Sequence, residues 1–291
     1  MRRRWPVPWP NSPQGSAALA VADGFAARNP LLARILTGVV LVVVALAAVQ
    51  RGGPFYTALI AAAVLIMFAE WSVMLKLGRG VRLAGLALLG GSIIAMTLLT
   101  TGEAVLTLVI GGALIGLFIG GLARGRGFWA FAGILYCGLP ALALIWLRGL
   151  ALGLAATVFV LVCVWATDIA AYFTGRAIGG PKLAPAISPN KTQAGAIGGI
   201  IGAMIVGGGL AMAYLVEMQG QGGWKFAIVA GVLAVLAILG DLFESWLKRR
   251  TGVKDSGNIL PGHGGVMDRL DGLVPVAIAG AAFFAVTGWA G

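Results

Sequence analysis

Charged residues, cysteine and histidine are all scarce in this chain. Only 11% of its 291 residues are charged, ten of them acidic, while 59% are hydrophobic. The two cysteines, Cys137 and Cys163, both fall inside apolar runs, which argues against a disulfide framework and against a cysteine zinc site. The low charge and a mean hydropathy of +0.96 place the chain among polytopic membrane proteins.

Apolar runs of about twenty residues recur along the sequence. A helix rises about 1.5 Å per residue, so such a run crosses a hydrocarbon core about 30 Å thick with its backbone hydrogen bonds closed internally. The sequence predicts nine such segments, at about 31–49, 55–75, 83–100, 104–122, 128–147, 151–174, 194–216, 226–247 and 272–290. We therefore expect an all-α fold of about nine transmembrane helices.

Lysine and arginine are divided unevenly between the two ends of these segments. With the N-terminus in the cytoplasm, all but Arg51, Arg148 and Lys225 of the 21 bases fall on the cytoplasmic side. Bases near helix ends are retained in the cytoplasm, so this split predicts a cytoplasmic N-terminus and a C-terminus on the periplasmic or outer side. It also explains the net charge of +11 without a nucleic-acid partner.

One stretch, Gly240–Asp271, contains half of the ten acids, five bases and the only histidine, His263. We call it the charged segment. Ionised groups within apolar helices cost free energy and usually face a protein interior or a water-filled cavity. The charged segment is therefore the first place to look for chemistry, and the predicted topology puts it at the cytoplasmic face.

Two predicted helices carry polar stripes near their cytoplasmic ends. In the sixth, Asp168, Tyr172, Gly175 and Arg176 are spaced to share one helix face, and in the eighth the same holds for Asp241, Glu244, Ser245 and Lys248. Both stripes are expected to point inward at about the same depth. An internal pair between an Asp and the Lys is the structural alternative for the eighth helix.

The segment after the sixth helix offers donors for phosphate. Ser188, Asn190, Lys191 and Thr192 supply hydroxyl, amide and ammonium groups just before the seventh helix begins. Such donors beside a helix N-terminus favour a phosphate site. The Lys-Thr pair is no P-loop, because GxxxxGK does not precede it and we expect no strand there.

The end of the charged segment suggests a metal site. Asp268 and Asp271 are three residues apart and can share one face, and Asp241 could join them from another helix. Carboxylates suit Mg²⁺, which keeps waters and bridges substrate phosphates, while the interleaved bases can neutralise phosphate oxygens. We expect His263 to contact a phosphate or the leaving group.

Other small and polar residues have packing interpretations. Gly195 with Gly199, and Gly198 with Gly202, have the spacing that lets helix backbones approach closely. Glu70, near the cytoplasmic end of the second predicted span, either lines a cavity or partners a nearby base.

The charged segment resembles the signature of the phosphatidate cytidylyltransferases, also called CDP-diacylglycerol synthases. The pattern SxxKRxxxxKDxGxxLPGHGGxxDRxD runs from Ser245 to Asp271. Gly240-Asp241, the stretch from Trp165 to Tyr172 and Ser188–Thr192 are also similar to that family. The resemblance covers about the C-terminal half, whereas the first spans match only in hydropathy.

This resemblance implies transfer of a cytidylyl group from CTP to phosphatidic acid, with release of pyrophosphate, in phospholipid biosynthesis. It implies Mg²⁺ as cofactor, and several carboxylates leave room for a second cation such as K⁺. The catalytic residues expected are Asp241, Lys248, His263, Asp268 and Asp271, with Asp241, Asp268 and Asp271 as metal ligands. The substrate-binding residues expected are Asp168, Tyr172, Ser188, Asn190, Lys191, Thr192, Ser245, Arg249, Lys254, Asp255 and Arg269.

The resemblance also implies an organisation for the whole protein. We expect a basic cytoplasmic tail at 1–30, scaffolding helices with an oligomer interface at 31–150, and the catalytic region at 151–291. The family suggests a homodimer in the bacterial inner membrane, surrounded by membrane lipids, with a cytoplasmic active site. One departure is Ala194, where the family pattern usually has Glu.

Two other functions stay open on the sequence. A CTP-dependent polyprenol or dolichol kinase also joins a cytidine nucleotide to a membrane lipid, but it releases CDP rather than pyrophosphate. A transporter could use Asp168 and Asp241 as coupling sites, although the chain lacks the inverted pair of broken helices that marks many transporters.

Overall fold

Helices make up most of the protein. The computed structural model describes residues 30–98, 126–216, 223–260 and 264–287, with isolated positions between 107 and 116. Eight of the nine predicted segments coincide with helices, whereas most of the segment predicted at 104–122 lies outside the described residues, as does the tail before residue 30. The helices are α2 (Pro30–Arg51), α3 (Gly53–Met74), α4 (Arg79–Leu98), α6 (Arg126–Gly149), α7 (Gly153–Ile178), α8 (Gln193–Ala211) with its π-helical continuation η1 (Met212–Val216), α10 (Trp224–Thr251), α11 (Met267–Leu270) and α12 (Leu273–Val286).

The all-α polytopic membrane architecture is confirmed. Among the described residues, six helices, α3, α4, α6, α7, α8 and α10, are long and apolar enough to cross a membrane. The described apolar parts of α2 and α12 are shorter. The total of nine spans and the sides on which the termini lie stay predictions.

Glycines end the helices that approach the site. Gly179 (φ 67°) follows α7, and Gly252 (φ 77°) follows α10 in the left-handed conformation that favours glycine. The Gly252 N–H bonds back to the carbonyl oxygens of Arg249 and Lys248, which closes the helix. The chain can then turn away from α10 into the loop that leads to α11.

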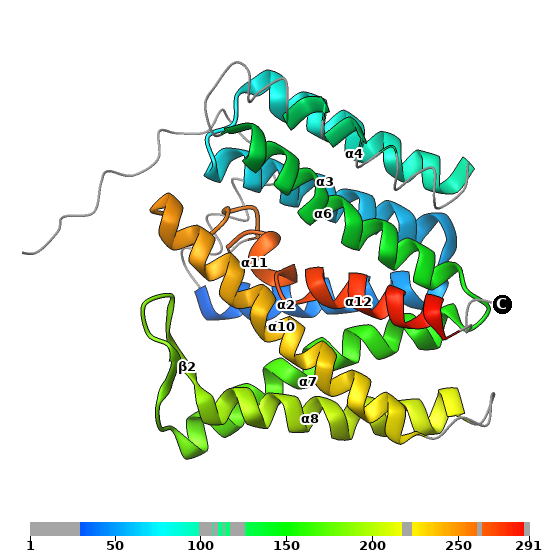
Figure 1. Cartoon of the computed structure of the whole chain (residues 1–291), viewed down its shortest axis with the longest axis vertical. Coiled ribbons are helices and arrows are strands. Elements are labelled where there is room, and N and C mark those ends of the chain that lie inside the picture. Colours follow the sequence, from blue (N-terminus) through cyan, green and yellow to red (C-terminus); the bar gives the residue numbers. More distant parts are fainter. Residues whose placement is uncertain are drawn as a thin grey trace, which may run out of the picture.

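The glycines of α8 form its contact with α7, as predicted. A Cβ atom on Gly195 would lie 2.9 Å from the carbonyl oxygen of Ala171, and one on Gly199 would lie 2.9 Å from that of Thr167. Only glycine permits so close an approach of the two backbones. Figure 1 shows α7 and α8 side by side, with α10 crossing them.

The segment between α7 and α8 is a short hairpin, so the expectation of no strand was wrong. Strand β1 (Lys182–Ala184) pairs antiparallel with β2 (Ser188–Thr192), with Lys182 opposite Thr192 and Ala184 opposite Ser188. Pro189 is tolerated because each strand of a two-stranded ribbon has a free edge. The hairpin brings Lys182 and Lys191 to the end of α7.

Two apolar clusters hold the helices together, and each draws on both halves of the chain. One combines the end of α2 and the start of α3 with α7, α10 and α12. The other packs α3, α4 and α6 against Leu247 and Met267 of the charged segment and Val274 of α12. The division at residue 150 stays a prediction, but the two halves share their cores.

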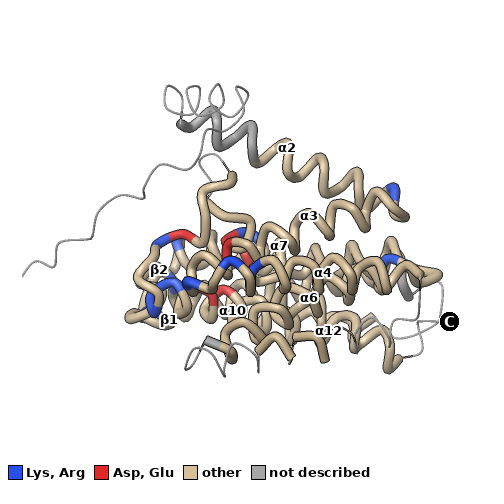
Figure 2. Tube along the Cα trace, turned by 90° about the horizontal axis from the view of Figure 1, so that it is seen from above, with Lys and Arg blue, Asp and Glu red and all other residues tan. Residues whose placement is uncertain are grey.

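Charged side chains gather at one end of the helices. Figure 2 shows most of the described acids and bases near β1, β2 and the end of α10. Arg51 lies just before α3, and the Arg148 Nε donates to the Val49 carbonyl oxygen at 2.8 Å, so both lie at the end of α3 opposite Glu70 and the charged segment. This is the uneven distribution that the sequence predicted.

Candidate active site

A pocket of about 800 Å³ opens where α7, the hairpin, the start of α8 and α10 meet. The predicted stripe on α7 faces it, since Asp168, Tyr172, Gly175 and Arg176 are all lining residues. The remaining polar lining residues are Thr167, Lys182, Asn190, Lys191, Thr192 and Asp241. Asp241 is the one residue of the charged segment among these described lining residues, whereas Lys248, Asp268 and Asp271 lie outside the lining.

An ion pair joins the hairpin to the charged segment. The Lys191 ammonium of β2 contacts the Asp241 carboxylate of α10, which also accepts a hydrogen bond from the Ser245 hydroxyl at 3.3 Å. Lys191 is held by the hairpin register and Asp241 by its helix, so the pairing fixes the width of the pocket at this point. Both side chains are about one-third exposed, at 28% and 33%, and can therefore be reached by a ligand.

Thr192 has a local structural role as well as a place in the pocket. It is the N-cap of α8, and its Oγ1 accepts a hydrogen bond from the Gly195 N–H at 3.0 Å. Such a cap satisfies one of the unpaired amides at the start of a helix. Ala194 lies in that same first turn, which contains no acid, and nothing in the described structure explains the departure from the family pattern.

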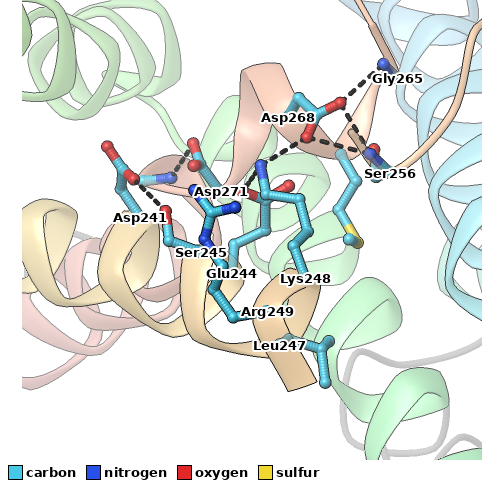
Figure 3. Close-up of polar contacts among 12 residues, drawn as sticks. Asp241, Glu244, Ser245, Leu247, Lys248, Arg249, Ser256, Gly265, Asp268 and Asp271 are labelled. Carbon is cyan, nitrogen blue, oxygen red and sulfur yellow. Dashed lines mark hydrogen bonds and ion pairs between the residues drawn. The ribbon is translucent and has the colours of Figure 1, made fainter. Parts of the chain in front are cut away.

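Lys248 lies between two buried carboxylates. Its Nζ is 2.6 Å from Glu244 Oε2, one turn earlier on α10, and 2.7 Å from Asp268 Oδ1 on α11 (Figure 3). The internal pair considered for the eighth predicted span thus exists, but its acid is Glu244 rather than Asp241. Lys248 is the link between α10 and the second half of the charged segment.

Asp268 also organises the loop before it. Its carboxylate accepts hydrogen bonds from the Ser256 N–H at 3.0 Å and from the Gly265 N–H at 2.8 Å (Figure 3). Burial by itself raises the pKa of Asp268, but hydrogen bonds from Glu244, Lys248 and the Gly265 amide outweigh it and lower the pKa to about 2. Asp268 is therefore ionised at any physiological pH.

Asp271 has the opposite character. Burial and the nearby Asp241 charge raise the pKa of Asp271 to about 7, although the Gly272 N–H donates to its Oδ1 at 2.8 Å. Two carboxylates that repel each other in a partly buried site are stabilised by a cation between them. Asp241 and Asp271 are thus the pair that would gain most from a bound metal.

The donor set suits a hard cation, but it does not form a complete cage. Within the described part of the chain, no three Asp, Glu, His or Cys side chains are close enough together to hold a metal ion. Asp268 is instead engaged by Lys248 and backbone amides, and Glu244 Oε1 is buried without a hydrogen-bond partner among the described atoms. Mg²⁺ needs only one or two protein carboxylates when phosphates and water complete its shell, so the residues present fit it.

Several predicted residues take other positions. Arg249 donates from Nε to the Ile187 carbonyl oxygen of the hairpin at 3.4 Å, and Ser188 pairs with Ala184 rather than lining the pocket. Lys254, Asp255 and Arg269 are exposed. His263 lies outside the described residues.

Sequence reasoning missed two contributors. Lys182 lines the pocket because it lies on the hairpin that borders it. In the sequence, its place among the bases that follow α7 was the feature that could have indicated this role. Glu70 accepts hydrogen bonds from the loop before α11 rather than pairing with a base. A contact between residues 196 positions apart leaves no local pattern in the sequence that could predict it.

The fold and the pocket together define a polytopic membrane protein with a basic, acid-lined pocket at one end of its helices. The cytidylyltransferase family matches residues 32–287, and the chain belongs to this family. It is therefore a nucleotidyltransferase, as the signature implied.

Named relatives agree with this family. A phosphatidate cytidylyltransferase from Brucella suis is 45% identical over 258 residues, which cover 85% of this chain and 90% of the relative. One from Helicobacter pylori is 43% identical over 154 residues, covering 53% of this chain and 50% of the relative. One from Staphylococcus haemolyticus is 47% identical over 119 residues, or 41% and 45% of the two chains.

Proposed function

We propose that this protein is a phosphatidate cytidylyltransferase, which converts CTP and phosphatidic acid to CDP-diacylglycerol and pyrophosphate. The similarity to the Brucella suis enzyme carries the proposal, because it extends over 85% of this chain and 90% of that protein. The pocket supports it, since Arg176, Lys182 and Lys191 bring three cations to one cavity. A cavity of this kind suits polyanionic substrates.

In the reaction, a phosphate oxygen of the lipid attacks the α-phosphorus of CTP. The new P–O bond forms as the bond from the α-phosphorus to the bridging oxygen breaks, and pyrophosphate leaves with that electron pair. A phosphate is already a nucleophile, so the enzyme mainly has to position two polyanions and neutralise their charge. The pocket bases serve this purpose, and Asp241 holds Lys191 in place.

Mg²⁺ is part of the proposal. Asp241 and Asp271 would hold it, with Asp268 available only if it leaves Lys248. When bound, the metal supplies positive charge to phosphate oxygens. Glu244, with its unpaired Oε1, is a candidate for the second cation.

The membrane setting follows from the surface next to the pocket. On α7, Ile169 and Phe173 are 59% and 64% exposed on the same helix that presents Asp168 and Tyr172 to the cavity. Such apolar surface suits acyl chains while the headgroup reaches the bases. We propose that the pocket faces the cytoplasm of a bacterial inner membrane, and that the enzyme is a homodimer, which cross-linking in native membranes would test.

The decisive experiment identifies the products. Purified protein in detergent should release pyrophosphate only when CTP, phosphatidic acid and Mg²⁺ are all present, and mass spectrometry should find CDP-diacylglycerol. Release of CDP with a phosphorylated lipid would instead support the polyprenol kinase alternative. Flux into sealed vesicles without nucleotide would support a transporter.

Asp268→Asn tests the centre of the charged segment. The variant loses the charge that pairs with Lys248, so turnover should be abolished. Thr97→Ala is the control, because among the described residues the Thr97 hydroxyl bonds to the Ile94 carbonyl oxygen of its own helix α4. Turnover like that of the wild type in Asp268→Asn would contradict the assignment.

A further inference from the structure

Glu70 is a buried carboxylate that the proposed reaction does not use. It lies on α3 and is only 4% exposed. Its Oε1 accepts the Val266 N–H at 2.9 Å, and its Oε2 accepts the Met267 N–H at 2.9 Å and the Ser256 hydroxyl at 3.2 Å. One side chain of the first half of the protein thus binds both ends of the loop between α10 and α11.

The same loop also fixes the side chain of Asp268 through backbone amides. Ser256 donates its N–H to Asp268 and its hydroxyl to Glu70, so a single residue bridges the two carboxylates. Gly265 donates to Asp268, and the next two residues along the chain donate to Glu70. The Ser256 and Gly265 amides that bind Asp268 therefore lie in or next to the residues that Glu70 binds, and Glu70 orients them through those residues.

Two glycines of the signature are explained by this carboxylate. A Cβ atom on Gly257 would lie 2.6 Å from Glu70 Oε1, and one on Gly265 would lie 2.7 Å from both Glu70 oxygens. These separations are shorter than any ordinary contact, so a side chain at Gly257 would displace the Glu70 carboxylate, and one at Gly265 would meet the Ser256 hydroxyl oxygen even more closely than Glu70. Two glycines of the signature segment are therefore in close contact with Glu70, which comes from the first half of the chain.

Glu70 does not touch the substrate pocket. It is not among the residues that line the described cavity, and Lys248 reaches Asp268 from the other side. Any effect of Glu70 on turnover must pass through Asp268 and its loop.

We propose that Glu70 is a positioning residue for nucleotidyl transfer, which anchors residues 255–260 and 264–267 so that Asp268 faces Lys248. This rests on the proposed function. Residues that orient the side chains of an active site, without touching the substrate themselves, typically contribute about 10- to 100-fold to activity. Because Glu70 acts on the position of a catalytic side chain and not on CTP, its loss should lower kcat and leave KM for CTP little changed.

The test compares Glu70→Gln with Ser72→Ala in the full-length protein in detergent. Glutamine keeps the size of the side chain but offers one acceptor oxygen to three donors. Ser72 is the matched control, since it is buried on the same helix and its hydroxyl bonds only to the Phe68 carbonyl oxygen. We expect kcat to fall about 10- to 100-fold in Glu70→Gln and to be unchanged in Ser72→Ala.

Two further measurements separate positioning from simple stability. Hydrogen exchange should speed up at 255–260 and 264–267 in Glu70→Gln, with no change elsewhere in α3. Ser256→Ala should also lower kcat. Adding Ser256→Ala to Glu70→Gln should lower kcat little further, because both changes break the same Ser256–Glu70 hydrogen bond.

The outcomes are distinct. A Glu70→Gln variant with wild-type kcat and a protected loop would overturn the proposal. If the wild type itself fails to convert CTP and phosphatidic acid, the proposed function fails, and hydrogen exchange alone then decides whether Glu70 anchors the loop.

Discussion

Lys248 pairs with two carboxylates of the charged segment. Its side chain is 15% exposed and neutralises Glu244 and Asp268, which are 1% and 7% exposed. Removing one partner of a buried ion pair typically costs about 3 to 5 kcal/mol, because an uncompensated charge is left behind.

Lys248→Met should therefore lower the apparent melting temperature markedly, consistent with a loss of about 3 kcal/mol or more. Adding Glu244→Gln should recover part of that loss, because one of the two stranded carboxylates becomes neutral. Lys182→Met, which changes an exposed base of the hairpin, is the control and should have little effect. Equal melting temperatures for Lys248→Met and Lys182→Met would show that the pairs contribute nothing to stability.

Asp271 predicts how stability depends on pH. Its folded pKa of about 7 lies above its usual value of 3.8, so ionisation is harder in the folded state than in the unfolded state. The stability linked to this group is full below pH 3.8 and is lost as the pH rises toward about 7.

In EDTA, the melting temperature should thus fall between pH 5 and pH 8. Mg²⁺ should raise it more at pH 8 than at pH 5, because only the ionised carboxylate binds the cation. Asp271→Asn should flatten both responses. A Mg²⁺ effect that is independent of pH would remove Asp271 from the metal site.

At the scale of elements, the α7–α8 contact depends on glycine. Gly199→Ala places a Cβ atom 2.9 Å from the Thr167 carbonyl oxygen, where the backbone cannot yield without moving a helix. Because the pocket lies between these helices, Gly199→Ala should lower both melting temperature and turnover. Gly209→Ala on the same helix meets nothing within 4 Å and should be neutral or slightly stabilising, since alanine favours helices over glycine.

The elements also show what the sequence could reveal. The stripes on α7 and α10 were predictable because one helix face repeats every three or four residues, and Asp168, Tyr172 and Asp241 do line the pocket. The β1–β2 hairpin was missed because two strands of three and five residues, one containing a proline, leave little period-two signal. Glu70 could not be assigned a partner, because its contacts span up to 197 residues and depend on how the whole chain packs.

At the scale of the whole molecule, the N-terminal helices do more than anchor the protein. Leu247, Met267 and Val274 pack into the same cluster as Phe68 and Trp71 of α3. The charged segment is thus seated on the first half of the chain by apolar contacts and by Glu70. The signature lies in the second half of the chain, but its packing and hydrogen bonds involve helices of the first half.

The distribution of charge across the molecule predicts the side from which CTP arrives. The pocket is lined by α7 and the hairpin, and Figure 2 shows most described bases near that hairpin and the end of α10. Arg51 and Arg148 lie at the other end of the helices. Bases are retained on the cytoplasmic side of a membrane, so the pocket should open there, and CTP is too highly charged to cross the bilayer unaided.

Inverted membrane vesicles that contain phosphatidic acid should therefore convert added CTP to CDP-diacylglycerol, whereas intact spheroplasts should not. Permeabilising the spheroplasts with detergent should restore the activity, which controls for enzyme content. Conversion by intact spheroplasts would place the pocket on the outer side and reverse the predicted topology. Equal conversion by both sealed preparations would mean that the protein is inserted in both orientations. The three bases predicted on the outer side would then oppose the bases around the pocket in setting the orientation.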